Sequence, residues 1–167
     1  ANEFAKLPHI GESLLRKEDL RFLTGKGQYT DDINQAHQKY AVFVRSPHAH
    51  AAILGIDTAD AARMPGVAAI YIGQDIEGKM NGLPCGWLIS NPDGSPMKEP
   101  PHPVLAQGKV RYVGDHVALV VADTLEQAKN AAEAVQVDYE ALPAVIDMRT
   151  AAQGPALHDA APDNHCY

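Results

Sequence analysis

The stretch VALVVADTLEQAKNAAEAVQVDY, residues 117–139, predicts a strand, a helix and a second strand in succession. Residues 117–122 are continuously apolar, which is typical of a strand covered on both faces. Thr124 and Gln127 form a Thr-x-x-Gln capping box, in which each side chain binds a backbone amide at the start of a helix. Apolar and polar residues then alternate over 135–139, as in a half-buried strand. The chain therefore combines helices with a sheet.

A similar order of elements precedes this unit. The sequence predicts strands at 40–45, 51–57 and 67–72. Thr58 is placed to cap a short helix that ends before Pro65, because the residue preceding a proline disfavours the helical conformation. Two strand–helix–strand units thus recur in the chain. Helices and strands therefore alternate along much of the chain.

The N-terminal segment is predicted to contain little regular structure. Residues 11–25 favour a short helix that Gly25 ends in the left-handed conformation. Residues 27–30 indicate a brief strand, and the aspartates that follow it indicate a turn. We expect one domain over residues 1–167, with an N-terminal arm and short helix at 1–35.

Residues 78–108 differ from the rest of the chain in their many glycines and prolines. Proline removes a backbone donor, so neither a regular helix nor a central strand can continue through this segment. Two alternatives remain: an ordered arm that packs on a partner, or a flexible tether. Trp87 and Leu88 favour the arm, since a solvated tether has little use for large apolar side chains. They are the predicted partner interface.

Composition excludes several classes of protein. The chain has 14 Lys and Arg against 21 Asp and Glu, a formal net charge of −7, and no basic cluster. Nucleic-acid binding and attraction to anionic membranes are therefore disfavoured. The longest apolar run, 117–122, is far shorter than the ~20 residues that span a bilayer. The N-terminus has no signal-peptide pattern, and two distant cysteines, Cys85 and Cys166, indicate reduced thiols and a cytoplasmic location.

Two motifs could carry chemistry. His48 and His50 form a His-x-His pair that could supply two metal ligands, but zinc sites need three or four and no third ligand is evident. Hydrogen-bonded histidines packed near Arg45 are the favoured interpretation. Cys85 could be a nucleophile, yet the base and the activating setting that a catalytic thiol needs are not visible. A partly buried structural cysteine is favoured.

Other candidate motifs fail on spacing or context. The glycines of TGKGQYT, residues 24–30, do not match a phosphate-binding loop, which needs Gly-x-x-x-x-Gly-Lys between a strand and a helix. The four aspartates near predicted turns and helix starts suit backbone hydrogen bonding better than acid–base catalysis; they are Asp31, Asp32, Asp57 and Asp60. We therefore expect no catalytic, cofactor-binding or metal-binding residue in this chain.

Three blocks of sequence together resemble one family. They are GESLLRKEDLRFLTGKGQYTDDI at 11–33, VRSPHAHAAILGIDTADAARMPGVAAIYIGQDI at 44–76 and KVRYVGDHVALVVADTLEQAKNAAEAVQVDYEALPAV at 109–145. In this order the blocks resemble the N-terminal domain of the large subunit of the molybdenum hydroxylases, which include xanthine dehydrogenase, aldehyde oxidase and aerobic carbon monoxide dehydrogenase. The resemblance implies the α/β hammerhead fold, an α+β arrangement in which two strand–helix units pack around a mixed sheet. His116 departs from the family pattern, because many bacterial relatives have proline at this position.

The resemblance also implies a division of labour. Such holoenzymes are water-dependent oxidoreductases that hydroxylate aldehydes, purines or N-heterocycles, or oxidise carbon monoxide. They use molybdopterin, here expected as the cytosine dinucleotide, with 2Fe-2S clusters and FAD. The partners implied are the C-terminal molybdopterin-binding domains of the large subunit, an iron–sulfur small subunit and an FAD subunit. This chain would then be an inactive scaffold domain. The alternative is a stand-alone binding module that reuses the fold.

Overall fold

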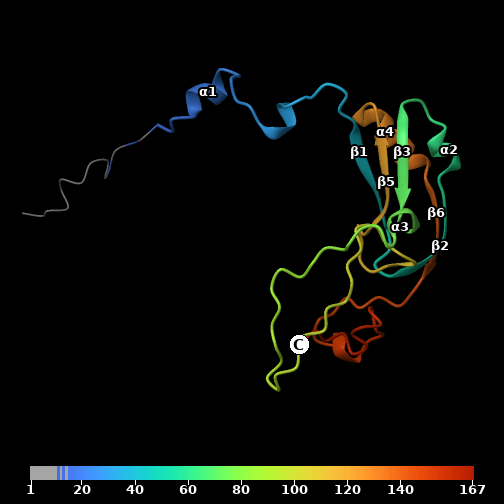
Figure 1. The fold of residues 1–167 in the computed structure, drawn as a ribbon. Coiled ribbons are helices and arrows are strands. Elements are labelled where there is room, and N and C mark those ends of the chain that lie inside the picture. Colours follow the sequence, from blue (N-terminus) through green and yellow to red (C-terminus); the bar gives the residue numbers. More distant parts are fainter. Residues whose placement is uncertain (1–10, 12, 14) are drawn as a thin grey trace, which may run out of the picture. The chain divides into compact units, whose positions relative to one another are not determined.

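The computed structural model describes residues 11, 13 and 15–167, and the chain divides into two units, Ala1–Gln38 and Lys39–Tyr167. Figure 1 draws both units. The part of the N-terminal prediction that concerns residues 1–10, 12 and 14 lies outside the described residues.

The N-terminal unit contains α1 (Asp19–Leu23), within the predicted range, and Gly25 follows it with φ +69°. The predicted strand at 27–30 is wrong, because a 3-10 helix, η2 (Thr30–Asp32), forms at its end. The carboxylate of Asp32 accepts a hydrogen bond from the backbone N–H of Tyr29 at 2.9 Å. This local bond stabilises a turn in place of an extended segment.

The second unit contains two antiparallel three-stranded sheets (Figure 1). In the first, β5 (His116–Ala122) lies between β1 (Tyr40–Arg45) and β3 (Val67–Ile72). In the second, β2 (Ala51–Asp57) lies between β4 (Lys109–Val110) and β6 (Gln136–Ala141). Apart from the strand expected at 27–30, the predicted strands are all present, and the α+β class is confirmed.

The expected mixed sheet is replaced by these two antiparallel sheets. Each strand–helix–strand unit leaves one sheet and enters the other: β2 leads through α2 (Ala59–Ala62) to β3, and β5 leads through α4 (Leu125–Ala134) to β6. A parallel pair forms when both strands of a crossover join the same sheet. Here they do not, so every strand pair is antiparallel.

Helix α4 carries the predicted capping box. The hydroxyl of Thr124 accepts from the N–H of Gln127 at 3.2 Å, and the Gln127 side chain accepts from the N–H of Thr124 at 3.1 Å. Thr58 does precede α2, but its side chain makes no capping bond. The carboxylate of Asp57 accepts from the N–H of Ala59 at 2.8 Å in its place.

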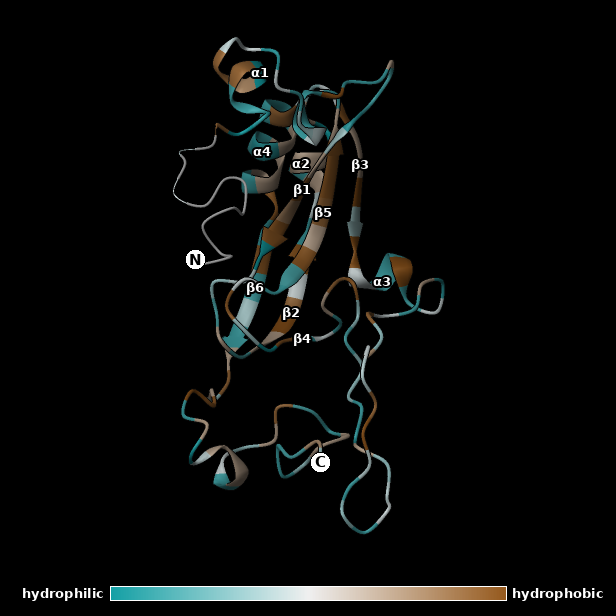
Figure 2. Cartoon of the chain, turned by 90° about the vertical axis from the view of Figure 1, so that its left-hand side faces the viewer, coloured by the Kyte–Doolittle hydropathy of each residue, from teal (hydrophilic) through white to brown (hydrophobic). Residues whose placement is uncertain are grey.

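The apolar core has two parts. Under α4, four buried side chains from α2, β5 and α4 pack together; they are Ala61, Val120, Ala131 and Val135. Figure 2 shows β1, β3 and β5 largely in the hydrophobic colour. A second cluster joins Ala51 and Val117 to Ala106 and Val110. Because Ala106 belongs to the segment 78–108, this cluster fixes one end of that segment to the sheets.

Candidate functional site

The glycine- and proline-rich segment 78–108, called the arm below, follows α3 (Gly73–Ile76) and returns to β4 (Figures 1 and 2). Its two limbs are bonded to each other. The N–H of Leu83 donates to the carbonyl of His102 at 2.8 Å, and that of Met97 donates to the carbonyl of Ile89 at 3.1 Å. At Gly82 the limbs approach so closely that a Cβ would collide with the His102 carbonyl. These bonds favour the ordered arm over the tether.

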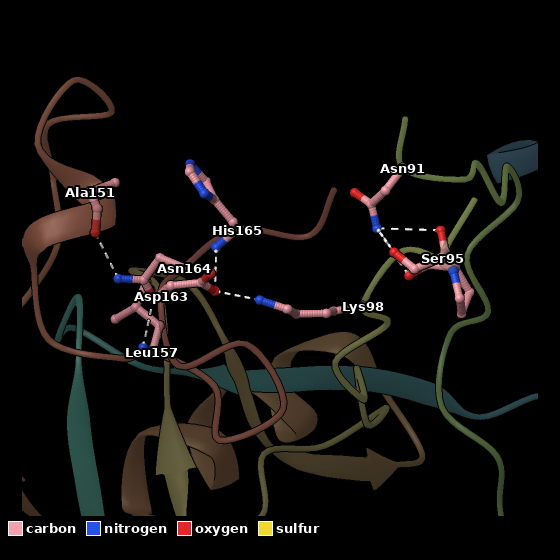
Figure 3. Close-up of polar contacts among 9 residues, drawn as sticks. Asn91, Ser95, Lys98, Ala151, Leu157, Asp163, Asn164 and His165 are labelled. Carbon is pink, nitrogen blue, oxygen red and sulfur yellow. Dashed lines mark hydrogen bonds and ion pairs between the residues drawn. The ribbon is translucent and has the colours of Figure 1, made fainter. Parts of the chain in front are cut away.

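A tight turn closes the tip of the arm. The N–H of Asn91 donates to the carbonyl of Ser95 at 2.8 Å, and its side-chain amide donates to the Ser95 hydroxyl at 2.9 Å (Figure 3). The Ser95 hydroxyl and N–H in turn donate to the carboxylate of Asp93. These bonds also lower the pKa of Asp93. The side chains of the turn therefore satisfy the backbone that the prolines leave without regular partners.

The C-terminal segment, residues 144–167, binds the returning limb of the arm. The N–H of Lys98 donates to the carbonyl of Cys166 at 2.7 Å, and its ammonium donates to the carboxylate of Asp163 at 2.6 Å (Figure 3). The bond from Lys98 lowers the pKa of the Asp163 carboxyl. The returning limb is thus held at Lys98 by a segment more than sixty residues later in the chain.

Asn164 organises this C-terminal segment. Its side-chain oxygen accepts from the N–H of Leu157, and its amide nitrogen donates to the carbonyls of Ala151 and Pro155, each at 2.9 Å (Figure 3). Asn164 has φ +54°, a conformation that asparagine tolerates better than most residues. One side chain therefore joins the 3-10 helix η3 (Ala151–Gln153) to the end of the segment.

The predicted interface residues lie on the outgoing limb of the arm. Trp87 is 80% exposed and Leu88 is 65% exposed. Leu83 and Met80, on the same limb, are also exposed. At the base of the arm, a cavity of about 230 Å³ is lined only by apolar residues; among them are Phe43 from β1, Leu119 from β5, Tyr71 from β3, and Met80 and Val104 from the arm. The arm and its base therefore expose apolar surface.

A second cavity, called the arm cavity below, has a volume of about 280 Å³ and lies between the arm, the loop before β5 and the C-terminal segment. Six of its lining residues bring chemically distinct groups together; they are Pro101, His102, Arg111, Tyr112, His158 and Cys166. No local sequence pattern indicates this grouping, because its members lie up to 65 positions apart.

Hydrogen bonds fix the polar groups of the arm cavity. Asp115, which is 8% exposed, accepts from the N–H of Arg111 at 3.0 Å, and the Nε of Arg111 donates to the carbonyl of Leu157 at 2.9 Å. The Tyr112 hydroxyl lies 3.4 Å from His102 Nε2. Burial, followed by the charge of Arg111, lowers the pKa of His158. Burial, followed by the Asp115 carboxylate, raises the pKa of Tyr112.

The two histidines of the His-x-His pair have different surroundings. His50 is buried, and its Nδ1 donates to the carbonyl of Pro143 at 2.8 Å, which assigns the proton to Nδ1 because a carbonyl only accepts. The His48 ring lies 4.9 Å from the Tyr139 ring. Among the described residues, no group of three or more His, Cys, Asp or Glu is placed to hold a metal ion.

The remaining candidates have structural contacts. Cys85 is exposed, not partly buried as expected, and its thiol donates to the carbonyl of Trp87 at 3.3 Å. Asp32 and Asp57 bind backbone N–H groups, as predicted, and Asp60 pairs with Arg63. None of the described helices has the length and apolarity needed to cross a membrane.

Known proteins resemble this chain in sequence over most of its length. The large subunit of nicotine 6-hydroxylase from Paenarthrobacter nicotinovorans is 42% identical over 156 residues, which are 93% of this chain and 18% of that protein. The large chain of carbon monoxide dehydrogenase from Afipia carboxidovorans is 38% identical over 148 residues, 88% of this chain and 17% of that one. The chain thus spans less than a fifth of the length of these relatives.

Solved structures of related proteins also resemble this chain. Quinoline 2-oxidoreductase from Pseudomonas putida 86 matches 88% of this chain and 18% of its own, with a TM-score of 0.74 and 40% identity. Aldehyde oxidoreductase from Desulfovibrio gigas matches 88% of this chain and 16% of its own, with a TM-score of 0.70 and 34% identity. Residues 24–143 match the family model described as aldehyde oxidase and xanthine dehydrogenase, a/b hammerhead domain. The chain therefore belongs to the aldehyde oxidase and xanthine dehydrogenase family and contains its hammerhead domain.

Proposed function

We propose that this chain is a supporting domain of a molybdenum hydroxylase large subunit and that its arm contacts a partner subunit. The family match over residues 24–143 supports the first part. Several relatives are named as large chains or as subunits of dehydrogenase complexes. In this proposal the chemistry occurs elsewhere in the assembly, at molybdopterin cytosine dinucleotide, 2Fe-2S clusters and FAD held by other domains and subunits.

The observation that carries the second part is the combination of order and exposure in the arm. Its limbs are bonded to each other and to the C-terminal segment, so Trp87 and Leu88 are presented on a prearranged support. Exposed aromatic and leucine side chains on such a support are typical of an interface, because little conformational entropy remains to be lost on binding. The iron–sulfur subunit is the proposed partner of this surface, and the molybdopterin-binding domains are the proposed partners of the rest.

The test is co-purification from the native source. The large subunit carrying Trp87→Ala and Leu88→Ala should retain less iron–sulfur subunit than the unchanged protein, since hot-spot truncations cost about 2 kcal/mol or more. Leu54→Ala is the matched control, because Leu54 is 61% exposed and lies on β2, not on the limb that carries Trp87 and Leu88. Equal retention by both variants would reject the arm interface.

Intact mass of the native polypeptide tests the supporting role separately. A polypeptide several times heavier than 17.9 kDa, or a stable complex with molybdopterin-containing polypeptides, is the expected result. A native chain of 17.9 kDa that purifies alone would favour the stand-alone binding module instead.

A further inference from the structure

The arm cavity contains a cationic group that the fold does not fully use. The Nε of Arg111 donates a hydrogen bond to the carbonyl of Leu157, and its backbone N–H donates one to the carboxylate of Asp115. Neither terminal nitrogen of its guanidinium has a hydrogen-bond partner among the described residues. Because a guanidinium presents five donors in a planar fork, two terminal groups remain to bind an acceptor from outside.

A second guanidinium lies close to the loop before β5. Arg45 donates to the carbonyl of Gly114, next to the buried Asp115, whose carboxylate accepts from the backbone N–H of Arg111. Arg111 lowers the pKa of His158, and Arg45 lowers the pKa of His116, with burial the larger cause in both. The Asp115 carboxylate acts in the opposite direction on the pKa of both histidines. The whole chain has a net charge of −7.

The shape of the arm cavity fits a small ligand. Its volume, about 280 Å³, is near the lower end of the range for ligand pockets. Prolines of the arm form apolar walls, and the polar lining consists of Arg111, His102, Tyr112 and His158 together with Asp115, whose buried carboxylate accepts the backbone N–H of Arg111. Apolar walls with a few convergent polar groups are typical of small-molecule sites.

We propose that the arm cavity binds a small oxyanion, a carboxylate or a phosphate, through the terminal nitrogens of Arg111. Bidentate bonding to a planar fork is the strongest form of carboxylate or phosphate recognition available to a side chain. The proposal is independent of the proposed function, because it concerns only residues of this chain.

The experiment is a titration of the full chain by two-dimensional NMR with sodium acetate and, separately, with inorganic phosphate. Sodium chloride at matched ionic strength is the reference. We expect saturable shifts confined to the signals of His102, Arg111, Tyr112 and His158 with at least one oxyanion, and no shift at Trp87. A response to acetate alone indicates a carboxylate ligand, and a response to phosphate alone indicates a phosphate ligand. Shifts that follow ionic strength, or none, would overturn the proposal.

Variants test the role of Arg111 itself. Arg111→Gln should weaken binding by about tenfold or more, and Arg111→Lys should weaken it less because the charge remains. Arg63→Gln is the control, since Arg63 pairs with Asp60 on α2 and does not line the cavity. Unchanged affinity in a folded Arg111→Gln protein would contradict the assignment. Should that variant fail to fold, the location of the shifts in the unchanged chain decides the question.

Discussion

At the scale of single residues, Val120 has the clearest role. It is fully buried in β5 and packs among side chains of α2 and α4. Val120→Ala should lower the free energy of unfolding by about 2 kcal/mol, from lost apolar burial and an unfilled cavity. Urea unfolding followed by circular dichroism measures the change. Leu54→Ala removes a larger but exposed side chain and should change stability little; a comparable loss in both variants would contradict the packing argument.

Two histidines predict how stability depends on pH. Burial and the charge of Arg45 lower the pKa of His116 from 6.5. His102 acts in the same direction, and Asp115 opposes it. Burial, Arg111 and His102 lower the pKa of His158 from 6.5. The carboxylates of Asp159 and Asp115 act in the opposite direction. The folded chain therefore binds fewer protons than the unfolded chain just below pH 6.5. The contribution of these two histidines to the free energy of unfolding is fully present above pH 6.5. It falls as the pH decreases toward the folded-state pKa values.

The corresponding measurement is the urea midpoint at about pH 7.5 and about pH 5.5. The midpoint should be lower at the acidic pH. A variant with both His116→Gln and His158→Gln should show a smaller difference between the urea midpoints at the two pH values, because glutamine does not titrate. A midpoint that stays constant or rises on acidification in the unchanged chain would refute this account.

At the scale of elements, the two threonines before α2 and α4 provide a matched comparison. Thr124 caps α4 through its hydroxyl, whereas Thr58 occupies the same position before α2 without a capping bond. Thr124→Ala should cost about 1 kcal/mol of stability, and Thr58→Ala should cost much less. Thermal or urea unfolding distinguishes them. Equal effects would indicate that the hydroxyl bond to Gln127 contributes nothing.

The C-terminal segment offers a second test at this scale. Asn164→Ala removes three hydrogen bonds, including the one from the N–H of Leu157. Hydrogen exchange of the Leu157 amide should become faster, with little change in β5. Asp159→Asn, an exposed change in the same segment, is the control. Unaltered exchange at Leu157 would mean that other contacts hold the segment.

The sequence predicted elements well where the signal was local. The capping box at Thr124 and Gln127 and the strand ending at Ala122 involve neighbours in the chain, and both are confirmed. The strand predicted at 27–30 does not form. The hydrogen bond from the N–H of Tyr29 to the carboxylate of Asp32 stabilises a turn there and outweighs a weak strand propensity. The same locality explains why Thr58 was assigned a bond that Asp57 makes.

At the scale of the whole molecule, what escaped prediction was the assembly of distant parts. Patterning identified the strands but not their sheets, since each crossover changes sheets and no local feature records this. The arm was recognised by its composition, whereas its attachment through Lys98 and Asp163 depends on residues 65 positions apart. The arm cavity escaped prediction for the same reason. The family resemblance, confirmed over residues 24–143, supplied the architecture that periodicity alone could not.

The order of the strands bears on how the chain acquires its structure. Among the described strands, no two that are consecutive in the chain pair with each other. Strands β1, β2 and β3 each pair only with strands from the later half of the chain, β4, β5 or β6. Pairings so distant in sequence make folding slow, because a large loop must close before any sheet can form. During translation, the apolar strands β1 and β3 therefore emerge from the ribosome long before their shared partner β5. This interval exposes them to chaperones and to aggregation.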